Sequence, residues 1–147
     1  MDRRLNFSET APEIYQALRA AEKALRTGPL DPIIRELVKI RGSQLNGCLF
    51  CVDMHVHEAL ELGETQDRIF QLPVWRESSL YTGRERAALA YTDSATRAPE
   101  GGVPDDVWDE AASCFKTEEL AALVGQVAII NAWNRIAAPT HAQPPRR

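Results

Sequence analysis

The chain has 147 residues, and its 17 Lys and Arg residues against 21 Asp and Glu residues leave a net charge of −4. That length is typical of a single domain. Ala, Leu, Glu and Arg far outnumber the β-branched residues Val, Ile and Thr, which predicts an all-α fold. The acidic balance argues against a nucleic-acid-binding protein, because such a protein needs a basic surface.

Two further features predict a cytoplasmic protein without membrane contact. The longest apolar stretch, Leu120 to Trp133, contains Gln126 and is shorter than the roughly 20 residues of a membrane-spanning helix. The N-terminus lacks the apolar core of a signal peptide. Three cysteines in a chain without an export signal do not form a disulfide framework, so we expect them to serve chemistry instead.

Periodicity and capping signals predict six to seven helices in chain order, after an extended segment over residues 1–9. Thr10 opens a capping box with Glu13, Asp31 is an N-cap before Pro32, and Thr82 opens a second capping box. The predicted helices run from Thr10 to Gly28, Asp31 to Asn46, Cys48 to Leu62, Thr65 to Gln71, Thr82 to Arg97, Pro104 to Cys114 and Glu118 to Ala137.

The two ends of the predicted domain differ in character. The last long helix is apolar on nearly every side, so we expect it to be central or to lie at a subunit contact. Residues 139–147 contain three prolines and no core residue, which predicts a disordered tail after a single domain over residues 1–138.

Cys48 and Cys51 form a C-x-x-C pair at the start of a predicted helix. Unpaired N–H groups and the helix dipole favour thiolates at this place. His55 follows Cys51 by one helical turn and lies on the same side of the helix. An imidazole there can exchange a proton with a thiol that reacts as a thiolate near neutral pH.

Glu36 is a candidate for orienting His55. The chain must turn back at Asn46 and Gly47, a pair suited to the left-handed backbone at a helix C-terminus. The helix that carries Glu36 is therefore expected to pack beside the helix that carries the cysteines.

The register of Glu36, Cys48-x-x-Cys51 and His55 resembles the signature of the AhpD-like alkylhydroperoxidase group in the carboxymuconolactone decarboxylase family. The segments Ser43 to Cys48, Val52 to His55 and Asn131 to Arg135 are similar to the smaller members as well. The likeness covers about residues 12–91, with weaker support to Ala137. It implies an all-helical fold that assembles as trimers or hexamers.

The resemblance also implies a function: a thiol-dependent peroxidase that reduces alkyl hydroperoxides in antioxidant defence. Carried onto this chain, Cys51 is the attacking thiolate and Cys48 resolves the sulfenic acid to a disulfide. His55 passes the proton and Glu36 polarises His55. No second redox centre is expected in the chain, so electrons must come from an external dithiol, either a thioredoxin-like or a lipoyl-bearing protein. No cofactor is implied.

The sequence leaves two points of the proposed peroxidase mechanism open. Position at the helix start favours Cys48 as the attacking thiolate, whereas proximity to His55 favours Cys51, and we choose Cys51. Some family members carry a second histidine between the cysteines, where this chain has Phe50, and that departure bears on the peroxidase rate.

Other classes remain as alternatives. The first is a carboxymuconolactone-type decarboxylase, although that branch of the family does without the dithiol. The second is a non-catalytic redox sensor, and the third is a zinc-binding interaction module. Zinc needs a fourth ligand from Cys114, His57 or His141, none of which has the spacing of a zinc site. Cys114 is expected to be a small core residue.

Overall fold

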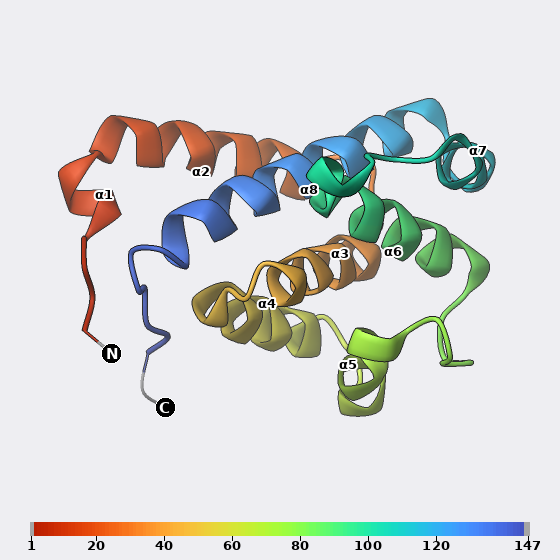
Figure 1. Ribbon diagram of the computed structural model, residues 1–147, viewed down its shortest axis with the longest axis horizontal. Helices are drawn as coiled ribbons and strands as arrows, with labels where there is room; N and C mark the ends of the chain where they lie inside the picture. Colours follow the sequence, from red (N-terminus) through yellow and green to blue (C-terminus); the bar gives the residue numbers. More distant parts are fainter. Residues whose placement is uncertain (1, 146–147) are drawn as a thin grey trace.

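Helices make up the computed structural model, which describes residues 2–145, and no strand occurs within that range. The predicted all-α fold is confirmed, with eight α-helices in place of the expected six to seven (Figure 1). They are α1 (Phe7–Thr10), α2 (Pro12–Arg26), α3 (Pro32–Leu45), α4 (Leu49–Glu61), α5 (Gln66–Gln71), α6 (Gly83–Thr96), α7 (Asp105–Cys114) and α8 (Thr117–Ala137), with short 3₁₀ turns at Leu72–Val74 and Ala98–Glu100.

Two of the three predicted helix caps are confirmed. The carboxylate of Asp31 accepts hydrogen bonds from the backbone N–H groups of Ile33 and Ile34, and Thr82 forms the reciprocal capping box with Glu85. The box at Thr10 is wrong, because α2 begins at Pro12 after Ala11. Thr10 instead ends the short helix α1, where its hydroxyl donates to the carbonyl of Asn6, so the segment predicted as extended is partly helical.

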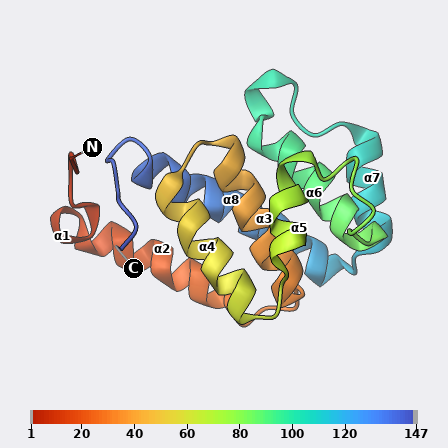
Figure 2. The ribbon, with the colours of Figure 1, turned by 90° about the horizontal axis from the view of Figure 1, so that it is seen from below.

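Helix α3 is the centre of the fold. Seen from below, it lies between α4 and α6, and α8 packs against it from another side (Figure 2). All residues from Ile34 to Ser43 are buried. The short connection to α4 uses Gly47 with a φ of 64°, as the sequence predicts, and this turn sets α4 beside α3.

The sequence predicts no segment able to span a membrane, and helix α8 departs from that prediction. Its 21 residues reach a mean hydropathy of 1.2 over an 18-residue window, so it is long and apolar enough to span a membrane by length and composition. In this fold it packs against α2, α3 and α6. Its polar side chains are bound within the protein: Asn134 donates to Ser43, and Asn131 donates to Thr96. About a third of that window, 33%, is buried inside the protein.

The N-terminal segment runs beside the segment that follows α8 (Figure 1). The backbone N–H of Arg4 donates to the carbonyl of Thr140 at 2.9 Å, and Ala142 packs against a small apolar cluster around the cysteines. Residues 139–143 therefore have contacts within the protein. The disorder predicted over 139–147 stays a prediction, and residues 146–147 lie outside the described residues.

Candidate active site

The two cysteines lie at the N-terminus of α4. Cys48 is its N-cap residue, and the backbone N–H of Cys51 donates to Cys48 Sγ at 3.4 Å. The pair forms a disulfide with a Cα–Cα distance of 5.4 Å. Both residues are buried, with exposed fractions of 0% for Cys48 and 2% for Cys51. Cys114 is free and packs against a separate apolar cluster near the end of α7.

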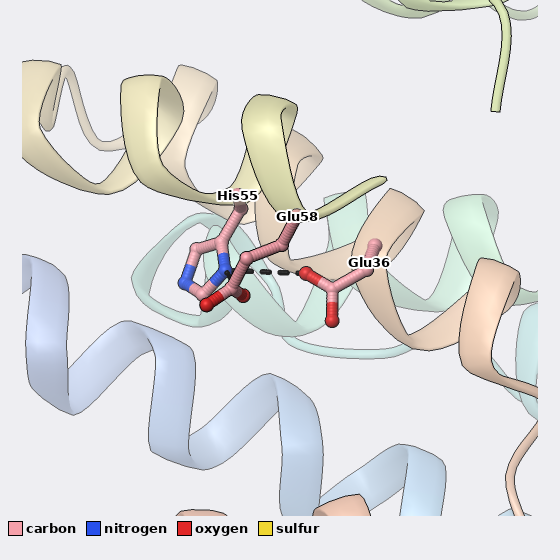
Figure 3. A group of neighbouring side chains, drawn as sticks. All are labelled: Glu36, His55 and Glu58. Carbon is pink, nitrogen blue, oxygen red and sulfur yellow. Dashed lines mark hydrogen bonds and ion pairs between the residues drawn. The ribbon is translucent and has the colours of Figure 1, made fainter. Parts of the chain in front are cut away.

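His55 lies one turn after Cys51 and meets two carboxylates through the same ring nitrogen. Its Nδ1 is 3.0 Å from an oxygen of Glu58 on α4 and 3.2 Å from an oxygen of Glu36 on α3 (Figure 3). Only one hydrogen can sit on Nδ1, so the two carboxylates share it. The predicted proximity of Glu36 and His55 is found, and it joins the two helices at the site.

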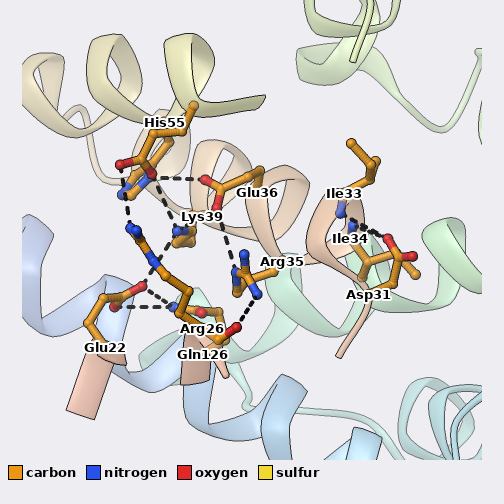
Figure 4. Close-up of polar contacts among 11 residues, drawn as sticks. Glu22, Arg26, Asp31, Ile33, Ile34, Arg35, Glu36, Lys39, His55 and Gln126 are labelled. Carbon is orange, nitrogen blue, oxygen red and sulfur yellow. Dashed lines mark hydrogen bonds and ion pairs between the residues drawn. The ribbon is translucent and has the colours of Figure 1, made fainter. Parts of the chain in front are cut away.

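Lys39 is the buried cation of this cluster. Its ammonium lies 2.7 Å from Glu36, 3.5 Å from Glu22 and 3.7 Å from Glu58 (Figure 4). The side chain is only 1% exposed. A buried charge needs such partners, because removal from water is otherwise strongly unfavourable.

Arginines and an amide complete the polar cluster. Arg35 lies 3.6 Å from Glu36, and Arg26 lies 3.8 Å from Glu58. The side-chain amide of Gln126 on α8 donates to Glu22 at 3.3 Å. The cluster therefore links α2, α3, α4 and α8 around His55 (Figure 4).

The surroundings favour the protonated form of His55. Burial opposes protonation, but hydrogen bonding to Glu36 and Glu58 outweighs it and raises the pKa of His55 above its ordinary value. The hydrogen bond to His55 in turn lowers the pKa of Glu58 to about 2. The two carboxylates thus stabilise the protonated imidazole of His55.

A cavity of about 710 Å³ opens beside the cluster. His55, Glu58 and Lys39 line it together with Phe50, the residue between the two cysteines. Its volume falls in the range of small-molecule sites. His55 is thus part of the cavity wall, whereas neither Cys48 nor Cys51 is among the lining residues.

The same polar cluster has the donor types of a metal site. Ligand atoms of Glu36, His55 and Glu58 lie within 4.8 Å of one another. However, the ammonium of Lys39 already supplies a positive charge to both carboxylates. No cysteine belongs to a group of three potential metal donors among residues 2–145, so the arrangement gives no support to the zinc alternative.

Sequence reasoning missed Glu58 and Lys39. Each follows a predicted site residue by three positions: Glu58 follows His55 on α4, and Lys39 follows Glu36 on α3. Side chains at this spacing share a helix face. That rule could have found both residues.

Comparison with known proteins shows the family of the chain. The sequence pattern of the Carboxymuconolactone decarboxylase family matches residues 12–94. The chain belongs to the Carboxymuconolactone decarboxylase family. It is 38% identical over 136 residues to the uncharacterized protein YdfG of Bacillus subtilis, covering 92% of each chain. It is 35% identical over 103 residues to the uncharacterized protein YnjA of Escherichia coli, covering 68% of this chain and 56% of YnjA.

Solved structures place the chain within the AhpD-like fold. The crystal structure of ATU0492 from Agrobacterium tumefaciens, a protein of unknown function with a suggested identity as the antioxidant defence protein AhpD, is similar with a TM-score of 0.96. Its sequence identity is 38%, and the match covers 99% of this chain and 100% of that one. The debrominase Bmp8 matches with a TM-score of 0.83 at 21% identity, over 93% of this chain and 74% of Bmp8. That second likeness concerns the fold alone.

Proposed function

We propose that this protein is a thiol-dependent peroxidase that reduces organic hydroperoxides through Cys48 and Cys51. The observation that carries the proposal is the carboxylate-bound His55 one helical turn after the buried cysteine pair. Glu36 and Glu58 engage Nδ1, which leaves Nε2 as the ring nitrogen for proton exchange. The similarity to ATU0492, with its suggested role in antioxidant defence, supports the same activity.

The reaction begins from the reduced pair. The Cys51 thiolate attacks the terminal oxygen of the hydroperoxide, the O–O bond breaks, and His55 donates a proton to the departing alkoxide, which leaves as an alcohol. Cys51 is then a sulfenic acid. The Cys48 thiol gives its proton to His55, and the resulting thiolate attacks the sulfur of the sulfenic acid. The S–S bond forms as the S–O bond breaks, and the departing hydroxide takes the proton back from His55 and leaves as water. In sum, two thiols and one hydroperoxide give one disulfide, one alcohol and one water.

The choice of Cys51 as the attacking thiolate rests on its position relative to His55. The two residues are four positions apart on α4, which brings their side chains to one face of the helix. Cys48 stands at the N-cap, where the helix dipole stabilises its thiolate for the resolving step. Each cysteine thus has a feature that suits its proposed role.

Reduction of the disulfide needs an external dithiol. We propose a thioredoxin-like or lipoyl-bearing protein in the cytoplasm, which attacks Cys48. Because Cys48 is fully buried, its exposed neighbours Gly47 and Leu49 must move to admit the reductant. Leu49 is 60% exposed and offers an apolar contact to such a partner.

Product analysis tests the proposed function. The fully reduced protein is mixed with one equivalent of cumene hydroperoxide, and the products are identified by mass spectrometry and chromatography. We expect one alcohol and one Cys48–Cys51 disulfide for each hydroperoxide consumed, with Cys114→Ser unchanged. Consumption that persists at this stoichiometry in Cys51→Ser contradicts the proposal. If the cysteine pair is oxidised but the protein does not consume further hydroperoxide when a dithiol reductant is present, the protein is a redox sensor instead.

A further inference from the structure

The cavity beside His55 has two chemically different parts. Its apolar wall comes from three helices: Tyr15 of α2, Phe50 and Met54 of α4, and Trp133 and Ile136 of α8. The rings of Tyr15 and Trp133 meet edge to face, with centroids 5.6 Å apart. This wall suits an apolar body on the ligand rather than a small polar peroxide alone.

Positive side chains also line the cavity. Arg19, Lys23 and Arg26 follow one another at spacings of four and three on α2, and Arg3 adds a fourth cation from the N-terminal segment. Such spacings bring side chains to one face of a helix. The chain as a whole carries a net charge of −4, so this concentration of cations is a local feature.

The cations and anions of the cavity differ in their partners. Glu22 contacts Lys39 and Gln126, and Glu58 contacts His55, so both carboxylates have partners within the protein. By contrast, neither Arg19 nor Lys23 has a hydrogen-bond or ion-pair partner for its side chain among residues 2–145. The cavity therefore offers unpaired positive charge at its edge and an apolar wall beside it.

We propose that the cavity binds an amphipathic organic anion, with its apolar body against Phe50 and Trp133 and its anionic head at Arg19 and Lys23. One further step rests on the proposed function. In that step, the hydroperoxide substrate is itself an amphipathic anion and carries the acidic head. The peroxide group then lies toward His55, and the alcohol product retains the acidic head. Carboxylate and phosphate heads share the chemistry that these cations recognise.

Binding can be measured without any redox step. Calorimetric titration of the disulfide form compares octanoate, octyl phosphate and octanol, which share one apolar body. We expect at least one of the two anions to bind about tenfold more tightly than octanol, and its affinity to fall with salt. The tighter of the two anions identifies the head group. Equal affinity of octanol and both anions, or binding of none of them, overturns the proposal.

Variants locate the anionic head. Arg19→Gln and Lys23→Gln are each expected to weaken binding of the preferred anion about threefold, and the double variant about tenfold, with octanol unaffected. Arg97→Gln is the matched control, since Arg97 is an exposed arginine outside the cavity lining. Anion affinity that is unchanged in the double variant contradicts the proposed place of the head.

A matched substrate pair separates this inference from the proposed function. A fatty-acid hydroperoxide and its methyl ester differ only in the acidic head, and we expect the acid to oxidise the dithiol about tenfold faster. The ratio should approach one in the double variant. Equal rates that both depend on Cys51 overturn the acidic substrate and leave the peroxidase intact. If neither compound reacts faster than with Cys51→Ser, the peroxidase is wrong, whereas the octanoate titration still tests the cavity.

Discussion

His55 has two carboxylates on one ring nitrogen, and the two differ in exposure. The side chain of Glu36 is 3% exposed and bound to Lys39, whereas that of Glu58 is 31% exposed and faces the cavity. We propose that Glu36 orients the imidazole from inside the protein. We propose that Glu58 joins the imidazole to the cavity, where protons can enter from solvent.

Removing either charge should slow the first oxidation step. Glu36→Gln and Glu58→Gln each remove an anion that raises the pKa of His55, so we expect that pKa to fall and the rate with hydroperoxide to drop about tenfold or more. The pH dependence of the rate measures both effects. Glu61→Gln, an exposed carboxylate at the end of α4, is the control. A full rate in Glu36→Gln removes Glu36 from the relay.

The raised pKa of His55 also predicts a pH dependence of stability. The folded protein binds a proton at His55 more tightly than the unfolded chain, so this stabilisation is fully present below the ordinary pKa of about 6.5. It is lost as pH rises through the raised value. Urea unfolding of the disulfide form between pH 6 and pH 9 should therefore show a decline. His55→Gln should flatten it, and an equal decline in that variant contradicts the assignment to His55.

Local signals in the sequence were sufficient for much of the site. The C-x-x-C spacing, the i+4 histidine and the turn at Gly47 together anticipated that Glu36 lies beside His55. The second carboxylate, Glu58, lies three positions after His55 on the same helix, a spacing that indicates Glu58 only once His55 is placed at the site. The cavity could not be predicted at all, since its wall is assembled from α2, α4 and α8, which are far apart in sequence.

At the scale of helices, α3 is held in place by charged residues as well as by apolar packing. Arg41 on α3 contacts Asp93 on α6 through two hydrogen bonds, of 2.6 and 3.3 Å. Asp93 also accepts from Trp75 and Arg76. Burial opposes ionisation of Asp93, but Arg41 and Arg76 outweigh it and lower its pKa. The pair is 52 residues apart in sequence, so no local pattern indicates it.

Loss of this contact should lower the stability of the protein without changing its thiol chemistry. Asp93→Ala leaves the buried guanidinium of Arg41 without its carboxylate, which should lower the free energy of unfolding by about 3–5 kcal/mol. Urea denaturation measures the loss, and Asp109→Ala on the exposed face of α7 is the control. The rate of thiol oxidation should stay unchanged while the variant is folded. A loss below about 1 kcal/mol contradicts the role of the pair.

At the scale of the whole molecule, several apolar side chains face solvent in the single chain. Phe70 is 73% exposed, and Ile14 and Val74 are 58% exposed each. We propose that such side chains lie at contacts between subunits, in the trimer or hexamer that the family resemblance implies.

Sizing of the purified protein tests the assembly. Light scattering coupled to size-exclusion chromatography at micromolar concentration should give a mass of three or six chains. Phe70→Glu is expected to shift the mass downward, whereas Glu100→Gln on an exposed turn leaves it unchanged. A single species of 16.4 kDa contradicts the proposed oligomer.

We propose Cys51 as the thiolate that attacks the hydroperoxide and His55 as its proton donor. Stopped-flow mixing of the reduced protein with an organic hydroperoxide measures it directly, with Cys48→Ser and Cys51→Ser alongside. We predict a fast first step in the native protein and in Cys48→Ser, and its loss in Cys51→Ser. Loss in Cys48→Ser with retention in Cys51→Ser means that Cys48 is the attacking thiolate. Equal rates in all three, at the level of an ordinary thiol, contradict the peroxidase.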